Sequence, residues 1–565
     1  MDSNTEKTSY SLFACIGTGF AGIGLGATLK RWYGIDDIQF FERHSQLGGT
    51  WFINQYPGCA CDVPSALYSY SFEPNPGWTK IMPTRTELWE YLDGVARKYD
   101  LLRRMKFETL VQRCEWIEER TRWRLTVRNL KSGTTYHHES QFLFAATGAL
   151  VTPRDIDVPG AETFKGIISH TGRWRPDIDL EGKRVVLFGN GCTASQVVPA
   201  IVHKTKSLTQ IVRTKHWVFP SIDSDVPEFL RFLLTWLPAL RLLQRLIIFC
   251  IAENGYRGFP LTSAGAKFRA SQRKVSEEYM KAAAPEKYHD MLIPDFEVNC
   301  KRRIFDCGYL KSLHAENFTL TNEKALEIVP EGVRTEKGLI EADVIILANG
   351  YITNQFVAGV DVVGRAGETL DTRWKSLGGE GAYNTCATNG FPNFFLLLGP
   401  NSGTGHTSTV MALENATNYA LRVLKPVLEG HASIATVKGD AEERFVNEMQ
   451  TALQKTVWNT GCGSWYTRHL DDGSNRWNAM SYPYSQGEFW YRSLFPVWSD
   501  WEYTGRATSI TSIQTQSFST SHMTVLALLA VFVAWSSLGS GWSHMTTNSL
   551  SAAMARPWSF APSHP

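Results

Sequence analysis

The sequence has no excess of charge of either sign and no internal repeat. Over 565 residues, Lys and Arg total 57 and Asp and Glu total 55, which leaves a formal net charge of +2. Because a nucleic-acid-binding surface needs a basic excess, this balance argues against nucleic acid as a partner. The length allows two or three domains with a substantial core.

Cysteine is present, but never in the pattern that metal sites and redox motifs use. The ten cysteines are scattered, and the closest pair, Cys59 and Cys61, is separated by one residue. A zinc site or a thioredoxin-like dithiol would need CxxC, so we predict no metal site and no disulfide reductase. Residues 1–10 are polar and lack the apolar core of a signal peptide. These absences predict a reducing, intracellular compartment.

One hydrophobic run carries no charge, residues 523–538 near the C-terminus. As a helix it would span roughly 24 Å, which is less than the ~30 Å hydrocarbon core of a bilayer. It follows a linker rich in Ser and Thr, residues 506–521. Two interpretations stay open: a C-terminal anchor that makes the protein membrane-associated, or an incidental hydrophobic tail on a cytoplasmic protein.

A glycine motif near the N-terminus indicates a dinucleotide site. An apolar strand predicted over 10–16 leads into G-x-G-x-x-G and then a helix, and a second strand over 38–41 ends at Glu42. The glycines permit a tight turn and bring backbone N–H groups to a pyrophosphate, while the acid suits ribose hydroxyls. The motif residues are Gly17, Gly19 and Gly22.

A second motif of this kind follows a strand predicted over 183–188. It has the form G-x-G-x-x-A and opens a helix predicted over 195–202. The next strand, 207–212, ends at Arg213 where the first fold has an acid. A guanidinium can pair with a ribose phosphate, which favours NADPH over NADH. The motif residues are Gly189, Gly191 and Ala194.

Further segments resemble those of flavin-containing monooxygenases. The glycine pair of 48–51 (GGTW) resembles the FAD-binding region of that family, which makes FAD the ligand of the first fold. Residues 146–148 (ATG) resemble the return crossing between its domains, and 343–351 (DVIILANGY) resemble a later strand beside the flavin. Residues 391–405 resemble the segment packed near the isoalloxazine.

Residues 164–174 match the F-x-G-x-x-x-H-x-x-x-W fingerprint of type I Baeyer–Villiger monooxygenases, although Arg175 departs from the pattern that follows it. The resemblance runs from about 10 to 505 and looks closest to fungal secondary-metabolism members. It implies that the fingerprint orders the linker between the domains rather than transferring a proton. The fingerprint residues are Phe164, Gly166, His170 and Trp174.

The same resemblance implies an active site. Residues 56–65 look like the family segment that supplies Asp62, residues 300–302 like the segment that delivers the active-site Arg302, and residues 463–466 like a late loop over the nicotinamide. Arg302 would hold a fixed positive charge beside the anionic oxygen intermediate, and Asp62 would position it. The cofactor contacts implied besides the glycine motifs and Glu42 are Gly49, Thr50, Trp51, Asp62, Tyr68, Arg213, Thr214, Lys301 and Trp465.

Residues 223–284 are predicted to be helical, within an insertion of about 223–290. The stretch 229–252 is strongly apolar but contains three arginines and a proline, which argues against a clean transmembrane span. It is either a buried helical insertion, the roof of a substrate tunnel or a membrane-surface segment. An apolar roof fits a lipophilic substrate.

The motifs predict an α/β fold with two Rossmann-like dinucleotide-binding domains and a helical insertion. The expected FAD domain comprises 1–150 and 325–505, the NADPH domain 151–324, and the linker and tail 506–565. The expected activity is Baeyer–Villiger oxidation of a lipophilic ketone by O2. Hydroxylation, epoxidation or N/S-oxygenation, a flavin reductase and a silent FAD-binding protein remain alternatives, and the sequence leaves substrate identity and oligomeric state open.

Overall fold

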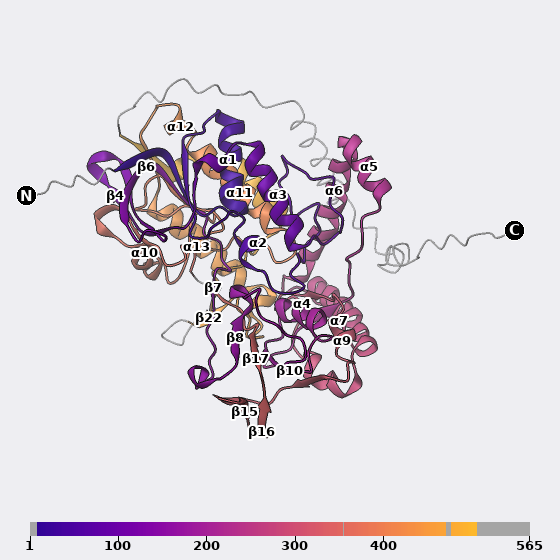
Figure 1. The fold of residues 1–565 in the computed structure, drawn as a ribbon. Helices are drawn as coiled ribbons and strands as arrows, with labels where there is room; N and C mark the ends of the chain where they lie inside the picture. The colour runs from indigo at the N-terminus through magenta and orange to yellow at the C-terminus, as the bar shows by residue number, and fades with distance from the viewer. Residues whose placement is uncertain (1–7, 354, 470–475, 506–565) are drawn as a thin grey trace, which may run out of the picture. The chain divides into compact units, whose positions relative to one another are not determined.

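The chain forms two separate large sheets, each of which leads into one glycine loop (Figure 1). The structure is a computed structural model that describes residues 8–353, 355–469 and 476–505. Helices cover both sheets, so the predicted α/β class is confirmed.

The first sheet contains eight strands in the order β19-β4-β5-β6-β1-β2-β3, with β20 beside β6. Successive side chains of β1 alternate between two cores, because Phe13 and Cys15 face one and Ala14 and Ile16 the other. β1 is therefore covered on both faces, as parallel strands usually are. The strands are β1 (Ser9–Ile16), β2 (Ile38–Phe41), β3 (Met105–Lys106), β4 (Thr109–Ile117), β5 (Arg122–Asn129), β6 (Thr135–Ala145), β19 (Asp361–Val363) and β20 (Phe394–Leu396).

The central helix against the first sheet is α1 (Phe20–Tyr33), of which eleven of 14 residues are buried. It packs on α3 (Arg85–Lys98) and α11 (Thr409–Val423). α3 starts with a capping box in which Thr84 and Glu87 satisfy each other's backbone N–H groups. The other helices of these parts of the chain are α2 (Thr50–Ile53), α10 (Leu370–Ser376), α12 (Lys425–Leu428), α13 (Gly439–Gln454) and α14 (Gln486–Leu494).

The second sheet is parallel and has the order β13-β10-β9-β17-β8. Along β9, Val185 and Leu187 face a core shared with the helices, while Val186 and Phe188 face the opposite side. The strands are β8 (Ile167–His170), β9 (Arg184–Phe188), β10 (Ser207–Ile211), β13 (Phe318–Thr321) and β17 (Val344–Leu347). The helices whose residues join this core are α4 (Cys192–Ile201), α7 (Ser263–Ala283), α8 (His289–Leu292) and α9 (Tyr309–Ser312).

The sequence predicts that the chain returns to the first fold at residue 325. This prediction is wrong for the residues up to the end of β17, which belong to the second fold. β17 pairs with β9 and β8, and the β14–β16 meander packs Ile328 and Val333 on the far face of the same sheet. The strand of 343–351 therefore lies in the second sheet and not beside the first. The sequence of an apolar strand looks the same whichever sheet the strand joins, so only its long-range pairing shows which sheet it belongs to. The meander is β14 (Ala325–Val329), β15 (Gly332–Thr335) and β16 (Gly338–Glu341).

Two short strands join the folds where the chain crosses between them. β7 (Thr152–Pro153) leaves the first sheet and β18 (Tyr351–Ile352) returns from the second, and the two pair antiparallel. The remaining strand pairs are β11 (Val218–Phe219) with β12 (Ile304–Phe305), β21 (Ile434–Val437) with β24 (Trp501–Thr504), and β22 (Arg468–His469) with β23 (Arg476–Trp477).

The predicted helical insertion is confirmed as α5 (Glu228–Trp236), α6 (Pro238–Asn254) and α7. Within the described ranges no single helix has the length and hydropathy to cross a bilayer, although α5 and α6 pass that test as a pair bent by 114°. The hydrophobic run 523–538 and the linker 506–521 lie outside the described residues.

Candidate active site between two dinucleotide folds

The first glycine loop joins β1 to α1 and leaves no room for side chains. Gly17 has a φ of +107°, and a Cβ there would lie 2.5 Å from the Ala146 carbonyl oxygen. A Cβ at Gly22 would lie 2.2 Å from the oxygen of Gly17. Gly19 caps α1, so the N–H groups of its first turn have no side-chain cap and can receive a phosphate. This cradle fits a dinucleotide.

Glu42 stands at the mouth of that loop. Its Oε2 accepts hydrogen bonds from the Thr18 N–H (3.0 Å) and hydroxyl (2.9 Å), and its Oε1 accepts from the His44 N–H (3.0 Å). The carboxylate is buried and held where β2 ends, which is the position that reaches a ribose in this fold.

The segment around Gly49 closes over the first loop. A Cβ at Gly49 would lie 3.1 Å from the Cα of Gly19, so the two backbones touch. Thr50 begins α2, and the buried Trp51 ring meets Tyr68 edge-on at 5.6 Å. These four predicted cofactor contacts therefore gather at one end of α1.

The second glycine loop repeats the first between β9 and α4. Gly189 has a φ of +120°, and a Cβ there would lie 2.2 Å from the Ala348 carbonyl oxygen. Gly191 caps α4 and has open space where its side chain would be, whereas Ala194 is fully buried. This loop also fits a dinucleotide phosphate.

A basic cluster lies beside the second loop. Arg213 and Thr214 are exposed after β10, and the Thr214 carbonyl accepts a hydrogen bond from Asn190 Nδ2 (3.2 Å). Lys301 lies close enough that burial, followed by the charge of Arg213, lowers the pKa of its ammonium group. Two cations from distant parts of the chain therefore lie close together after β10, where a ribose phosphate of a bound dinucleotide would be expected in such a fold.

Arg302 and Asp62 form a two-pronged ion pair. Arg302 Nε donates to Asp62 Oδ2 (2.7 Å), and Nη2 donates to Oδ1 (2.5 Å). Burial opposes ionisation of Asp62, but the Arg302 guanidinium outweighs it and lowers the carboxyl pKa. The Asp62 charge in turn raises the pKa of Arg302. The pair is therefore charged. The side chains of Arg302 and Asp62 remain 35% and 27% exposed, so a ligand can reach them.

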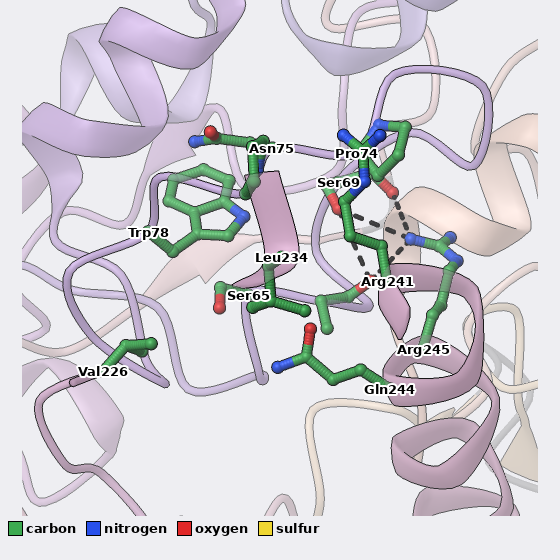
Figure 2. Close-up of a pocket in the computed structure, with 12 residues that line it drawn as sticks. Ser65, Ser69, Pro74, Asn75, Trp78, Val226, Leu234, Arg241, Gln244 and Arg245 are labelled. Atoms are coloured by element: carbon green, nitrogen blue, oxygen red, sulfur yellow. Dashed lines mark hydrogen bonds between the residues drawn. The ribbon is translucent and has the colours of Figure 1, made fainter. Parts of the chain in front are cut away.

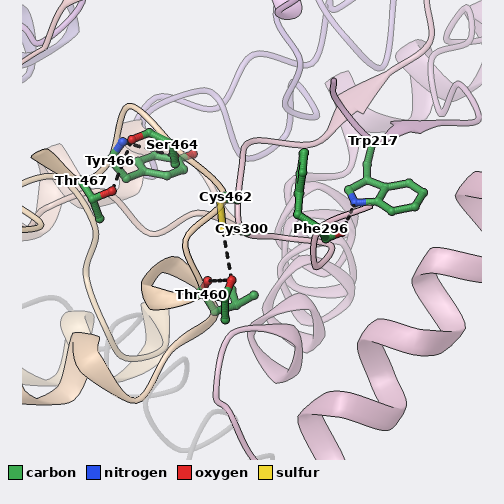
Figure 3. The surroundings of a disulfide bond; sticks show 9 residues. Trp217, Phe296, Cys300, Thr460, Cys462, Ser464, Tyr466 and Thr467 are labelled. Atoms are coloured by element: carbon green, nitrogen blue, oxygen red, sulfur yellow. Dashed lines mark hydrogen bonds between the residues drawn. A yellow bond between two sulfur atoms is a disulfide. The ribbon is translucent and has the colours of Figure 1, made fainter. Parts of the chain in front are cut away.

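A disulfide ties the Arg302 segment to the late loop. Cys300 and Cys462 are bonded, and Thr460 donates from its hydroxyl to the Cys300 sulfur at 3.4 Å (Figure 3). The bond holds Ser464 and Tyr466 near residues 300–302. Burial raises the pKa of Tyr466, and the nearby Arg302 charge opposes part of that rise. Trp465 is 39% exposed beside Tyr466. Sequence spacing gave no signal for this bond, because its cysteines lie 162 residues apart.

The fingerprint residues lie where the chain crosses between the folds. His170 ends β8, donates from Nε2 to the Gly350 oxygen (3.0 Å) and accepts from the Gly172 N–H at Nδ1 (2.9 Å). Its ring meets Tyr351 of β18 edge-on at 5.6 Å. Gly166 has no room for a Cβ, which would lie 2.2 Å from the Asp343 oxygen. Phe164 and Trp174 pack against the two cores of the second sheet.

Sequence reasoning missed the residues that bring Asp62 to the second fold. The Tyr56 hydroxyl donates to Gln196 Oε1 (2.9 Å), and Gln196 Nε2 donates to the Ala60 oxygen (3.0 Å). A Cβ at Gly58 would lie 2.4 Å from the Gln196 oxygen, so this segment lies directly on α4. The partners are up to 140 residues apart, and no local pattern could have paired them.

Comparison with known proteins agrees with this geometry. Residues 14–233 match the flavin-binding monooxygenase-like family. A Baeyer–Villiger monooxygenase of Streptomyces coelicolor is 35% identical over 482 residues, covering 84% of this chain and 89% of the relative. An FAD-binding monooxygenase of Aspergillus niger is 30% identical over 478 residues, covering 82% and 77%.

The fold also has solved counterparts. The structure of OTEMO in complex with FAD and NADP superposes with a TM-score of 0.76 at 21% identity, covering 88% of this chain and all of that one. The identity to these sequence relatives establishes the family, and the superposition on the solved structure establishes the fold. The chain therefore belongs to the flavin-binding monooxygenase family and, within it, to the type I Baeyer–Villiger monooxygenases.

Proposed function

We propose that the protein uses FAD, NADPH and O2 to convert a lipophilic ketone to an ester or lactone. The observation that carries this proposal is the charged Arg302–Asp62 pair, which is partly exposed. The pair interacts with Cys192 at the second glycine loop, and Arg302 also interacts with Tyr466 of the late loop. A fixed cation at such a place serves a reaction that passes through anionic oxygen. The role in secondary metabolism that the sequence resemblance implies is part of this proposal.

FAD would occupy the first glycine loop, with its pyrophosphate at the N-terminus of α1 and its ribose at Glu42. When bound, FAD supplies hydride acceptance from NADPH and the activation of O2. NADPH would occupy the second loop, with Arg213, Thr214 and Lys301 around its phosphate and Trp465 over its nicotinamide end. With the corrected boundary, residues 151–352 make the NADPH domain, and 1–150 with about 353–505 make the FAD domain.

Arg302 would stabilise the negative charge that develops as oxygen attacks the substrate carbonyl. Its guanidinium stays protonated at any relevant pH, and Asp62 fixes the plane of the fork while leaving part of it exposed. Asp62 is thus a positioning residue. His170 would act in ordering the crossover, since its hydrogen bonds go to Gly350 and Gly172.

We propose that the protein acts inside the cell, because eight of its ten cysteines are free thiols; the Cys300–Cys462 bond departs from what a reducing compartment predicts. We propose that residues 523–538 attach it to a membrane, because the run is uncharged and apolar.

Replacing the active-site arginine tests the assignment. In Arg302→Ala, NADPH should still reduce the flavin, while ketone oxygenation should fall by roughly 100-fold or more. Arg113→Ala removes an arginine that is also paired with an aspartate, Asp361 (3.0 Å), but on the edge of the first sheet, and should keep full activity. Retained product in Arg302→Ala would end the assignment.

Rapid mixing separates oxygenation from a simple reductase. NADPH-reduced enzyme mixed with oxygenated buffer should show a transient flavin absorbance before the oxidised spectrum returns, and adding ketones should give product. Reoxidation in one step with stoichiometric hydrogen peroxide, even with ketones present, would favour the reductase. Turnover of sulfides or amines but not ketones would favour heteroatom oxygenation.

A further inference from the structure

Helix α6 is apolar but buries none of its 17 residues completely. A helix of this composition normally places one stripe in a core and a polar face in water. Here the outward face is apolar as well: Leu243, Ile247 and Ile251, spaced four residues apart, are 51%, 50% and 57% exposed. The position of α6 in the fold therefore leaves apolar surface that the described chain does not cover.

Helix α5 carries a second exposed apolar stripe. Phe229, Phe232 and Trp236 are spaced three and four residues apart, share one face, and are 72%, 60% and 70% exposed. We call the combined surface the α5–α6 apolar face. Large exposed patches of this kind mark interaction sites rather than ordinary solvent surface. Its members are Phe229, Phe232, Trp236, Leu237, Leu242, Leu243, Ile247 and Ile251.

The inner side of α6 is firmly attached, so the exposure of its outer side does not come from a loose helix. Arg245 donates from Nη1 to the backbone oxygens of Ala66 (2.6 Å) and Ser69 (3.0 Å), as Figure 2 shows. It also pairs with Glu414 of α11 at 3.8 Å. Ile248 and Phe249 pack against the core of the first fold. The apolar face is therefore held outward.

Of the three arginines on α5 and α6, two are paired with glutamates and one is not, within the part of the chain that the structure describes. Arg231 pairs with Glu228 at 3.5 Å and Arg245 pairs with Glu414 at 3.8 Å, which leaves Arg241 without an acidic partner among the described residues. An anionic lipid headgroup would complement Arg241, and exposed Trp and Phe suit the boundary between headgroups and acyl chains.

We propose that the α5–α6 apolar face lies in the surface layer of an anionic phospholipid bilayer. The 114° bend between the helices and their short lengths fit in-plane attachment without crossing. The uncharged run 523–538 gives the same chain a second apolar segment with lipid affinity. Once one segment is attached to a bilayer, the other is held close to the same surface, so two weak attachments on one chain reinforce each other.

Vesicle flotation of the full-length holoenzyme tests this. The probe is phosphatidylcholine vesicles with and without about 30% phosphatidylserine. The parent protein for the comparison carries Leu528→Asp and Val531→Asp, which place charges in the run 523–538 without shortening the chain. That protein should still float with anionic vesicles, and adding Trp236→Ser and Ile247→Asn should lower the bound fraction roughly tenfold or more.

The matched control is Leu326→Ser/Leu339→Ser, which removes two apolar side chains 43% and 48% exposed on β14 and β16, away from α5 in Figure 1. It should float like its parent. Flavin content and NADPH oxidation should be unchanged in every variant. Hydrogen exchange of the unmodified chain gives a reading that needs no variant: vesicles should protect residues 228–254.

Three results would overturn the proposal. One is flotation of the Trp236/Ile247 variant equal to that of its parent. Another is complete loss of flotation in the Leu528/Val531 background, which would assign binding to the terminal run. The third is a vesicle-free dimer that the Trp236/Ile247 substitutions convert to a monomer while vesicle binding is unaffected, which would make the face a protein interface.

Discussion

The two glycine loops of this protein share one construction but differ in enclosure. In each, the first glycine turns with a positive φ against the carbonyl oxygen of a later A-x-G segment: Gly17 against Ala146, and Gly189 against Ala348. The later segments, 146–148 and 348–350, thus occupy equivalent places in two different sheets. The resemblance between the loops extends beyond the motif itself.

The difference lies in what surrounds the second glycine. Gly19 touches the backbone of Gly49, and eleven of the 14 residues of α1 are buried. Gly191 faces open space, and only five of the ten residues of α4 are buried. An enclosed loop suits a cofactor that stays bound through turnover, and an open loop suits one that must enter and leave in each cycle.

The largest effect on stability and bound FAD is expected from exchanging the third motif residue between the two loops. In Gly22→Ala the new Cβ would meet a backbone oxygen at 2.2 Å, and we expect loss of bound FAD and roughly 4 kcal/mol of stability. Ala194→Gly, the reverse change at the equivalent position, should cost about 1 kcal/mol and keep FAD. Flavin content and thermal unfolding measure both, and equal losses would contradict the asymmetry.

Removing the Cys300–Cys462 bond should act mainly on the second fold and the late loop. The bond closes a loop with a sequence separation of 162, so the Cys300→Ser/Cys462→Ser variant should lose about 4 kcal/mol of unfolding free energy. Because the bond holds the loop of Trp465, the KM for NADPH should rise while FAD content stays constant.

Dithiothreitol added to the unmodified protein should reproduce both effects. It should leave the double-serine variant unchanged. A loss of FAD in place of a KM effect would show that the bond supports the first fold.

Outside their loops the two folds should respond alike to acid, because each contains a histidine whose pKa is lowered. Burial, followed by the Lys106 charge, lowers the pKa of His138 in β6 to about 4, and burial with Lys301 lowers that of His216 to about 4. A depressed pKa gives stability that is complete above about 6.5 and falls with pH, by about 3 kcal/mol per group at pH 4.

Denaturant unfolding at pH 7 and at pH 4.5 would measure that loss. His138→Gln and His216→Gln should each reduce the acid sensitivity by a similar amount. A wild type whose stability is the same at both pH values would refute the linkage.

The smallest effect is expected at the open loop. Arg213→Ala should raise the KM for NADPH about tenfold and leave the KM for NADH unchanged, since only one phosphate contact is lost. Arg128→Ala removes an exposed arginine from β5 of the first fold and serves as the control. Equal effects on both coenzymes would mean that Arg213 does not contact the phosphate.

The sequence alone determined the local chemistry of both loops. A strand followed by closely spaced glycines and a helix is a local pattern, and β1, β2, α1, β9 and β10 lie close to where it predicted them. Family resemblance added Arg302 and Asp62, which the structure joins in one ion pair.

Only the tertiary structure decided which sheet receives β17, that Cys300 bonds to Cys462, and that α5 and α6 turn an apolar face outward. Pairing, disulfide formation and burial depend on contacts between residues far apart in the chain. The periodicity and composition of one segment do not specify such contacts, because their free energy depends on both partners and the second partner lies elsewhere in the chain.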